Sequence, residues 1–198
     1  MIIMRHNLSD TNELIRDRRT VSPEKFMPRK VHREVVEEIL RNGTWAPTHG
    51  MTQPWRFKVF IGEGVAKMAN QLPVWYKNYI GEEKFSQRKY DKLLARGEKC
   101  SVIIAVTMVA DPNGRIPVVE EMQAVACAVQ NMYLTCTAHG IGAKYSTPGY
   151  LYTEEVKEFL SLEEGGKVLG LFYLGYPEGN WPKSHRKPLE YVTEWIDE

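Results

Sequence analysis

A ten-residue apolar run from Ser101 to Ala110 is the feature of this chain that most limits how it can fold. The run reads Ser-Val-Ile-Ile-Ala-Val-Thr-Met-Val-Ala and is rich in β-branched side chains. Its apolar residues follow one another without polar alternation, so both faces of the segment must be covered by other parts of the chain. The run therefore predicts a buried strand at the centre of a sheet.

A second long apolar segment runs from Pro117 to His139 and is predicted to be a helix. It holds no interior Gly or Pro, it is rich in Ala, Met, Val and Gln, and apolar residues lie on nearly every side of it. This pattern is typical of a deeply buried helix, which Gly140 would end.

The other segments give a mixture of strands and helices. Strands are expected near 56–61, 101–109, 143–147 and 167–174. Helices are expected from Ser9 or Asp10, over 31–43, as a short segment over 65–72, and from Thr153. Because strands and helices alternate, the class is mixed α and β, and the parallel or antiparallel order of the strands stays open.

Length, net charge and the lengths of the apolar runs narrow the class of protein that is expected. The 198 residues fit a single domain, 1–198, and the net charge of +1 gives no reason to expect nucleic acid or a membrane surface as a partner. The apolar start, Met1 to His6, is too short for a signal peptide, and no run could span a membrane, so we expect a cytoplasmic protein. Cys100, Cys127 and Cys136 lack C-x-x-C spacing, which favours reduced, structural thiols.

The stretch from Trp45 to Phe57 is a candidate functional loop. Pro47 and Pro54 each lack an N–H and push the preceding residue out of helical geometry, so the segment between them is not helical. It carries a hydroxyl, an imidazole and a primary amide, from Thr48, His49 and Gln53. A connector this polar between apolar elements is more plausibly a ligand-facing loop than a simple connection.

Three other segments have both a plain and a functional interpretation. Arg18, Arg19 and Thr20 suit the end of a helix, where cations meet the negative pole of its dipole, but two guanidinium groups and a hydroxyl also suit a phosphate dianion. Arg186 lies in a second basic cluster, in a tail that would ordinarily be solvated. The glycine-rich segment 140–149 permits close backbone approach to a planar ring, although it lacks the G-x-G-x-x-G spacing of a dinucleotide site.

Together these segments resemble the FMN-dependent nitroreductase family. Residues 46–57 read Ala-Pro-x-x-x-x-x-Gln-Pro-Trp-x-Phe, the family's central signature, and the arginine motif, the glycine-rich segment and a basic residue before Pro188-Leu189 occur in the family's order. The His in the loop indicates the branch with short chains. The resemblance covers most of the sequence and is weakest over 72–99.

The resemblance implies an α+β, three-layer sandwich with a central mixed sheet, assembled as an intertwined homodimer with two flavins at the interface. The arginine motif and the Ser146 region would come from one subunit, and the loop with His49 and Gln53 from the other. Residues 72–99 have two interpretations: a cap over the flavin pocket, or surface helices whose aromatic side chains pack inward.

The resemblance also implies roles for individual residues. Arg18, Arg19, Thr20 and Arg186 would bind the FMN phosphate and ribityl chain. The amide of Gln53 would meet the pyrimidine edge. Backbone around Tyr145, Ser146, Thr147 and Pro148 would approach the ring near N5 and O4. His49 would contact FMN across the interface, or else cap nearby backbone.

The implied activity is an NAD(P)H oxidoreductase that works by a ping-pong route. NADH or NADPH would reduce the flavin, which would pass two electrons to a nitroaromatic, a quinone or a similar acceptor. Flavin N5 carries this chemistry, so no catalytic residue of the protein and no metal are expected, in keeping with the lack of G-x-S-x-G, H-E-x-x-H and paired ligand motifs. The alternatives are enone reduction, dehalogenation or flavin degradation on the same scaffold, and a protein that stores flavin or senses redox state without turnover.

Two positions depart from the family pattern. Met51 stands where many members have Asn, and a thioether cannot hydrogen-bond a flavin or substrate edge in the same way. Ser22 stands where many have a basic residue that would stabilise negative charge on the reduced ring. That role falls to Arg19 or to another group.

Overall fold

The computed structural model describes residues 6–197, and at its centre is a four-stranded sheet with the order β1-β2-β4-β3. The strands are β1 (Trp55–Ile61), β2 (Val102–Met108), β3 (Gly142–Ser146) and β4 (Lys167–Gly175). Every neighbouring pair is antiparallel. The four predicted strands are therefore present, each within one residue of its expected bounds.

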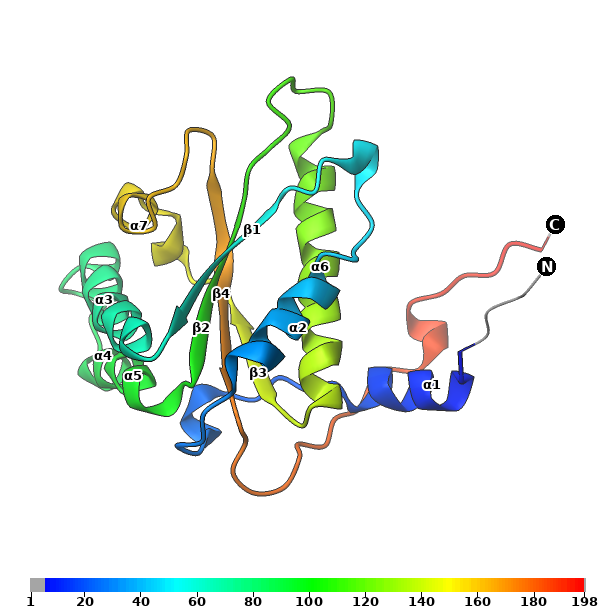
Figure 1. The fold of residues 1–198 in the computed structure, drawn as a ribbon, viewed down its shortest axis with the longest axis horizontal. Coiled ribbons are helices and arrows are strands. Elements are labelled where there is room, and N and C mark those ends of the chain that lie inside the picture. The colour runs from blue at the N-terminus through cyan, green and yellow to red at the C-terminus, as the bar shows by residue number, and fades with distance from the viewer. Residues whose placement is uncertain (1–5, 198) are drawn as a thin grey trace.

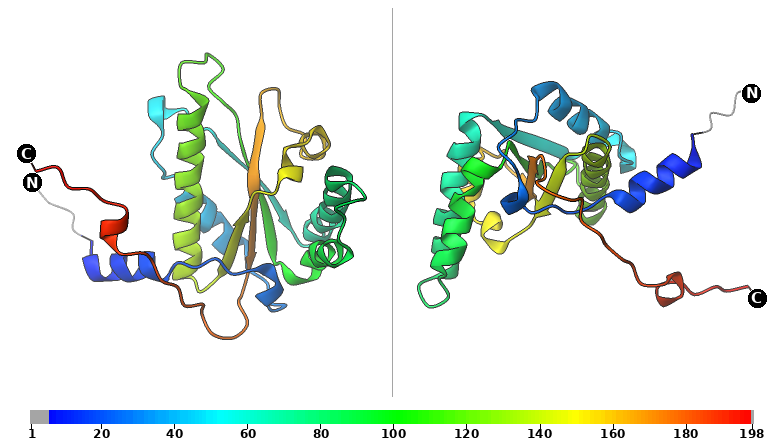
Figure 2. Two further views of the ribbon diagram at one scale, coloured as in Figure 1. Left: turned by 180° about the vertical axis from the view of Figure 1, so that it is seen from behind. Right: turned by 90° about the horizontal axis from the view of Figure 1, so that it is seen from below.

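Helices cover both faces of the sheet and give three layers (Figures 1 and 2). On one face lie α2 (Arg33–Gly43) and α6 (Val118–Ala138). On the other lie α3 (Glu63–Ile80), α4 (Gln87–Leu94), α5 (Arg96–Lys99) and α7 (Glu154–Phe159). Short 3-10 helices occur at Pro23–Lys25, His49–Met51, Gly149–Tyr152 and Leu189–Tyr191. The predicted α+β sandwich is confirmed, and so is the long buried helix.

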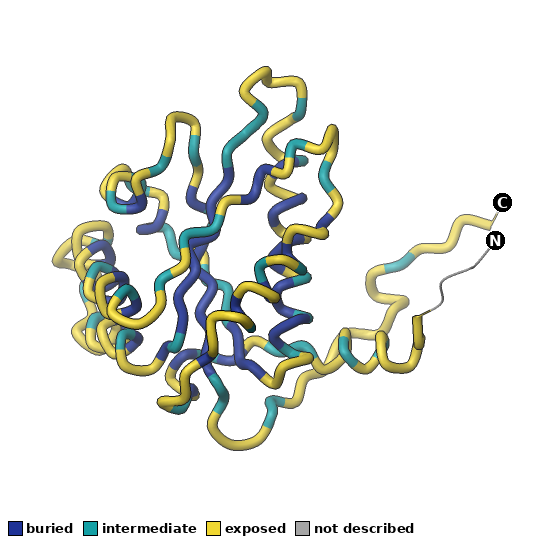
Figure 3. Tube along the Cα trace, viewed as in Figure 1, coloured by how far each residue is buried: buried dark blue, intermediate teal, exposed yellow. Residues whose placement is uncertain are grey.

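The central strand β2 is buried along its whole length, as its apolar run predicted (Figure 3). Val102, Ile104 and Val106 pack in the core beneath α6, whereas Ile103 and Ala105 pack in a second core beneath α3. Burying one such branched side chain contributes about 1.5–3 kcal/mol. The two cores hold the helical layers to opposite faces of the sheet.

Parallel pairing within the described residues is limited to one isolated bridge, between Thr20 and Ala143. The N–H of Val21 donates to the carbonyl of Ala143 at 2.9 Å, so the chain just after the arginine motif runs along the free edge of β3. Within one chain, the mixed character implied by the resemblance amounts to this bridge beside four antiparallel strands.

α3 is longer than the short helix predicted over 65–72, because it continues through Pro73 to Ile80. A proline inside a helix costs about 3 kcal/mol through its missing N–H and the clash of its ring. Pro73, Trp75 and Tyr76 are all buried, and their packing outweighs that local cost. Sequence pattern alone did not reveal this tertiary compensation.

α1 (Leu8–Asp17) and the C-terminal segment project from the three-layer body on the α6 side (Figures 1 and 2). The cap of α1 is Asn7, whose side-chain oxygen accepts from the N–H of Ser9 at 2.9 Å, so the helix begins slightly before the expected Ser9 or Asp10. No residue of α1 is buried. Of the apolar start considered above, residues 1–5 lie outside the described part.

Two of the three cysteines are buried, and all three are free. Burial raises the pKa of the Cys100 thiol to about 12 and also raises that of Cys136. Cys127 lies exposed on α6, unlike the other two thiols. None of the helices in residues 6–197 combines the length and the apolar character that crossing a membrane requires.

Candidate active site

Arg18 stands at the C-terminal end of α1, beside an aromatic ring. Its guanidinium carbon lies 5.3 Å from the centroid of the Tyr133 ring, and its Nη1 lies 3.5 Å from the hydroxyl of Thr20. A cation–π contact uses the face of the guanidinium and leaves N–H groups free to bind an anion. Arg18 and Thr20 therefore form a pair of donors suited to a phosphate.

Arg19 is turned toward the chain itself. Its Nε donates to the carbonyl of Pro182 at 2.8 Å, and its Nη1 donates to the carbonyls of Arg18, at 2.9 Å, and Arg16. These bonds occupy part of the guanidinium fork. Arg19 thus ties the arginine motif to the C-terminal segment, and its contact with a phosphate stays a prediction.

A tryptophan holds the same C-terminal segment to α1. The indole Nε1 of Trp181 donates to the carbonyl of Asp17 at 2.7 Å. Arg186 follows Pro182 by four residues, so their Cα atoms lie within about 14 Å of each other. The Arg186 side chain is exposed and donates to Ser184 Oγ at 2.7 Å. The segment that carries Arg186 is therefore attached to the end of α1, next to the arginine motif.

The ring of Tyr145 lies close to β4 near the C-terminal end of β3. Its N–H donates to the hydroxyl of Tyr133 at 2.5 Å, and a Cβ added at Gly170 of β4 would lie only 2.5 Å from its ring. Burial raises the pKa of the Tyr145 hydroxyl, which therefore stays neutral. A glycine inside a strand pattern signals close approach of this kind, so Gly170 could have been found from the sequence.

A cavity of about 600 Å³ opens where β3 ends. Tyr145 and Thr147 line it together with apolar residues of α6 (Met122, Val125, Ala126) and of β4 (Val168, Leu169). Its volume falls in the range usual for ligand and cofactor pockets, about 300–1,000 Å³. The neighbouring Ser146 is half-buried, and Pro148 caps the 3-10 helix that follows.

The predicted loop contains the 3-10 helix His49–Met51 and left-handed backbone. The φ angles of Met51 and Gln53 are 54° and 45°, in a region that costs a non-glycine residue roughly 1–3 kcal/mol. The loop is held by internal bonds, among them one at 3.2 Å from the N–H of Gln53 to Thr48 Oγ1. The side chains of Met51 and Gln53 are exposed.

His49 is paired with the first turn of α6 rather than with nearby backbone. Its Nδ1 lies 2.6 Å from Oε2 of Glu120. The loop also packs on Ile116, whose Cδ1 lies 3.4 Å from the position of a Cβ built at Gly50. The imidazole is therefore fixed relative to α6.

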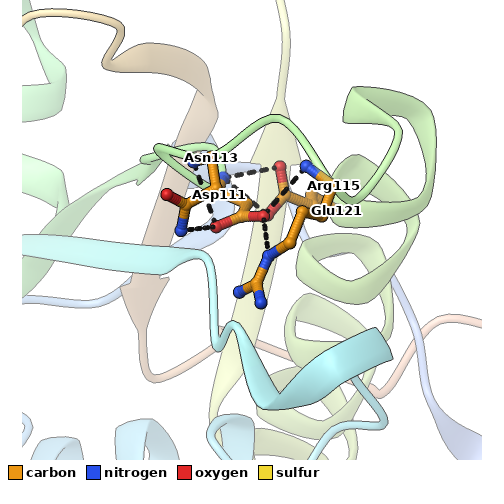
Figure 4. Close-up of polar contacts among 4 residues, drawn as sticks. All are labelled: Asp111, Asn113, Arg115 and Glu121. Carbon is orange, nitrogen blue, oxygen red and sulfur yellow. Dashed lines mark hydrogen bonds and ion pairs between the residues drawn. The ribbon is translucent and has the colours of Figure 1, made fainter.

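The residue next to Glu120 anchors a second loop to the same turn of α6 (Figure 4). Glu121 is buried, and its carboxylate accepts the N–H of Asp111 at 2.9 and 3.2 Å. Burial alone would raise the pKa of Asp111, but the N–H and guanidinium of Arg115 and the N–H of Asn113 hold it below its ordinary value. Carboxylates at a helix N-terminus are favoured by the helix dipole, so the sequence carried a signal for this pair.

The predicted residues form two groups in one chain. Arg18 lies against Tyr133, while His49 lies against Glu120, thirteen residues earlier on α6. At 1.5 Å per residue these positions are about 20 Å apart along the helix. Neither His49 nor Gln53 lines the cavity beside Tyr145. Tyr133, which meets both Arg18 and Tyr145, was not predicted, since nothing in its sequence setting marked it.

Residues 72–99 form the end of α3 followed by α4 and α5. Trp75 and Tyr76 are buried in the second core, as expected for surface helices whose aromatics pack inward. Tyr79 is half-exposed and reaches Gly149, where an added Cβ would lie 2.5 Å from its hydroxyl. This part of α3 thus borders the segment after β3, and a cap over a ligand stays a prediction.

The two departures from the family pattern fall in different groups, Ser22 directly after the arginine motif and Met51 in the loop with His49. Ser22 is half-buried and caps the 3-10 helix Pro23–Lys25, and Met51 is 72% exposed. Within residues 6–197 no group of three or more His, Cys, Asp or Glu side chains is placed to hold a metal ion.

Comparison with known proteins assigns the chain by sequence. A model of the nitroreductase family matches residues 15–176. YdjA of Escherichia coli, whose name places it provisionally among NAD(P)H nitroreductases, is 28% identical over 169 residues, which cover 85% of this chain and 89% of YdjA. YfhC of Bacillus subtilis, named in the same way, is 25% identical over 185 residues, 93% of each chain.

Solved structures show the same fold. A nitroreductase-like protein from Bacillus cereus matches over 100% of both chains with a TM-score of 0.80 and 26% identity. A Desulfovibrio desulfuricans protein solved with FMN has a TM-score of 0.71 at 23% identity, covering 97% of this chain and 99% of its own. NfnB of Mycobacterium smegmatis, an FMN-dependent nitroreductase solved with NADPH, has a TM-score of 0.73 at 18% identity, covering 96% and 100%. With a family match across most of its length and this fold, the chain belongs to the nitroreductase family.

Proposed function

We propose that the chain binds FMN and acts as an NAD(P)H-dependent oxidoreductase that passes two electrons, by a ping-pong route, to nitroaromatics, quinones or similar acceptors. Membership of the nitroreductase family supports the oxidoreductase class. The FMN complex from Desulfovibrio desulfuricans and the NADPH complex of NfnB support the choice of cofactor and donor.

The observation that carries the proposal is the placement of two ligand-binding segments along one edge strand. Thr20 is bridged to Ala143 of β3, Tyr145 follows on the same strand, and Thr147 comes directly after the strand beside the cavity. At about 3.3 Å per residue, Ala143 and Thr147 lie roughly 13 Å apart. A ligand with a phosphate at one end and a planar ring system at the other suits that arrangement.

The side chains at the two ends of this arrangement suit the two ends of FMN. Arg18 offers a permanently charged guanidinium and Thr20 a hydroxyl, which together suit a phosphate monoester. Arg186 would reach the same phosphate from the anchored C-terminal segment. The apolar residues of the cavity wall, with the ring of Tyr145 close to Gly170, suit a planar ring, and Tyr152, Lys157 and Lys167 form the polar part of that wall.

A bound flavin would supply the chemistry, accepting hydride from NAD(P)H and passing two electrons to an acceptor that next enters the same cleft. The chain's own residues would bind and orient the flavin. Arg18, Thr20 and Arg186 would hold the phosphate, and backbone from Tyr145 to Pro148 would approach the ring. The loop amide of Gln53 can both donate and accept at the pyrimidine edge.

A homodimer would complete the site, because the loop with His49 and Gln53 lies apart from the other predicted residues within one chain. The C-terminal tail supports association with a second copy. Its apolar side chains lack cover in the described chain, with Trp195 77% and Ile196 84% exposed. Exposed apolar side chains on an extended tail suit a contact with a second copy of the chain.

The test is spectroscopic. The purified protein should be yellow or turn yellow with FMN, and its visible flavin absorbance should bleach anaerobically with NADH or NADPH and return when a nitroaromatic or quinone is added. Flavin binding without bleaching by either donor would instead indicate storage or redox sensing. A protein that stays colourless with added FMN would contradict the proposal.

A further inference from the structure

The imidazole of His49 is held by a carboxylate from a distant part of the chain. Nδ1 of His49 lies 2.6 Å from Oε2 of Glu120, 71 residues later in the sequence. One comparable contact occurs elsewhere in the described chain, between Nε2 of His139 and Oε2 of Glu38 at 3.0 Å. The two contacts use different ring nitrogens, so they fix different tautomers.

The contact with Glu120 determines which nitrogen of His49 carries the hydrogen. An ionised carboxylate only accepts hydrogen bonds, so Nδ1 must donate. In the neutral ring Nε2 then carries a lone pair and can accept a hydrogen bond. No partner for Nε2 lies within residues 6–197, and the His49 side chain is 63% exposed. The ring thus presents an acceptor to whatever covers the loop.

Both sides of this contact are held in place. Glu120 stands in the first turn of α6, where the helix dipole favours a carboxylate, and the adjacent Glu121 is buried and bonded to the N–H of Asp111. On the loop side, Ile116 packs against Gly50, and the N–H of Gln53 bonds to Thr48. The loop and the first turn of α6 are thus both anchored around this contact, which leaves Nε2 on the side of the ring away from Glu120.

We propose that Glu120 is a positioning residue, which holds His49 in the Nδ1–H tautomer so that Nε2 accepts the N3–H of a flavin bound to a second copy of the chain. This inference rests on the proposed function.

The chemistry of the flavin edge favours that tautomer. The pyrimidine edge of the isoalloxazine presents one N–H, at N3, between two carbonyl oxygens. A bare Nε2 matches N3–H, whereas an Nε2–H would point a donor at a donor. Gln53, in the same loop, carries an amide that can meet a flanking carbonyl. The loop would then offer an acceptor, Nε2 of His49, and a donor, the amide of Gln53, to the pyrimidine edge.

The tautomer can be read directly by ¹⁵N NMR of the histidine side chains at neutral pH. In the wild-type protein His49 should show a protonated Nδ1 and a bare Nε2, even without flavin, and Nε2 should shift when FMN is added. Glu120→Ala should return His49 to the Nε2–H form that free imidazole side chains prefer. Glu120→Gln retains an accepting oxygen, so it should preserve much of the wild-type tautomer and keeps the test valid if the alanine variant does not fold.

The link to flavin is tested by a double-mutant cycle on the FMN dissociation constant, using His49→Ala, Glu120→Ala and the double variant. Each single change should weaken FMN binding about tenfold, the usual scale for one lost hydrogen bond to a polar partner in a desolvated site. Because Glu120 acts through His49, the double variant should be no weaker than His49→Ala alone. Losses that multiply would show that Glu120 acts independently, and would overturn the proposal.

Glu38→Gln provides the matched control, since it alters the other His–carboxylate pair. It should change the ¹⁵N signals of His139 and leave both the His49 signals and the FMN dissociation constant as in the wild type. An equal loss of FMN affinity in Glu38→Gln and Glu120→Ala would mean that both act through general stability, which contradicts a positioning role.

The outcomes separate this inference from the proposed function. A wild-type protein that binds no FMN contradicts the proposed function, whatever the His49 tautomer. A wild-type protein that binds FMN but shows His49 as Nε2–H, or no coupling in the cycle, contradicts the role of Glu120 alone.

Discussion

The indole Nε1 of Trp181 donates a hydrogen bond of 2.7 Å to the backbone carbonyl of Asp17, joining the C-terminal segment to the end of α1. The bond sets where the tail that carries Arg186 leaves the body of the protein. Trp181→Phe removes the donor and keeps an aromatic ring. We expect FMN affinity to fall several-fold and unfolding free energy to fall by about 0.5–1.5 kcal/mol, the net value of one hydrogen bond. Isothermal titration and urea unfolding measure the two effects, and unchanged FMN affinity would show that the tail does not depend on this anchor.

Arg18 and Arg19 are adjacent but are expected to do different work. Arg18→Ala should weaken FMN binding by one to two orders of magnitude, because a hydrogen bond to a charged group contributes roughly 1.5–3 kcal/mol. Arg19→Ala should mainly lower stability, since its guanidinium donates to backbone carbonyls. The exposed Arg88→Ala on α4 is the control. FMN titration of the three variants measures the affinities. A larger loss of FMN affinity in Arg19→Ala than in Arg18→Ala would reverse the roles assigned to the two arginines.

Gly170 permits the ring of Tyr145 to lie against β4. Gly170→Ala should lower the free energy of unfolding by about 1–3 kcal/mol, because the added Cβ would lie 2.5 Å from the Tyr145 ring and force the ring to move. The FMN affinity of this variant should fall together with its stability. Gly64→Ala, in α3 with 3.6 Å to its nearest neighbour, should instead be neutral or stabilise by up to about 1 kcal/mol. Denaturant unfolding of both variants provides the check, and a neutral Gly170→Ala would show that Tyr145 has room to shift.

The cysteines should differ sharply in reactivity and in their effect on alkaline stability. Cys127 is exposed and should react with a thiol reagent in the native protein, while Cys100 and Cys136 react only after unfolding. Burial raises the pKa of Cys100 from 9.0 to about 12, so between these values the unfolded chain loses its proton while the folded chain keeps it. Stability should therefore fall as pH rises above about 9. Cys100→Ala should lessen that fall, and labelling of more than one thiol in the native Cys100-containing protein would contradict the burial.

Much of the fold followed from periodicity because its strongest signals are local. The run at 101–110 predicted a strand covered on both faces, and the segment 117–139 predicted a long buried helix. The bounds predicted for α3 were wrong. Pro73 signals a helix end locally, yet the packing of Trp75 and Tyr76 carries the helix through it. Such compensation arises from contacts between segments far apart in sequence, which a single sequence does not display.

The candidate site was predicted in part, and for the same reason. Arg18, Thr20, Tyr145 and Thr147 could be named from motifs, and the structure places Thr20 beside β3, Tyr145 on it, Thr147 directly after it and Arg18 against Tyr133. Tyr133 and Gly170, which contact Arg18 and Tyr145, and Glu120, which contacts His49, come from other elements and carry weak signals of their own. A glycine in a strand and an acid in the first turn of a helix have common structural explanations, so only the assembled fold shows what each contacts.

The central claim is that two copies of the chain share each flavin, one giving Arg18 and Thr20 and the other the loop with His49 and Gln53. Complementation tests it most directly. Arg18→Ala and the double variant His49→Ala/Gln53→Ala should each bind FMN poorly. Unfolded and refolded together, they should form mixed dimers with one intact site and regain tight FMN binding and NAD(P)H oxidation. A mixture that binds no more FMN than its components, or a wild-type monomer that binds FMN tightly, would contradict the account.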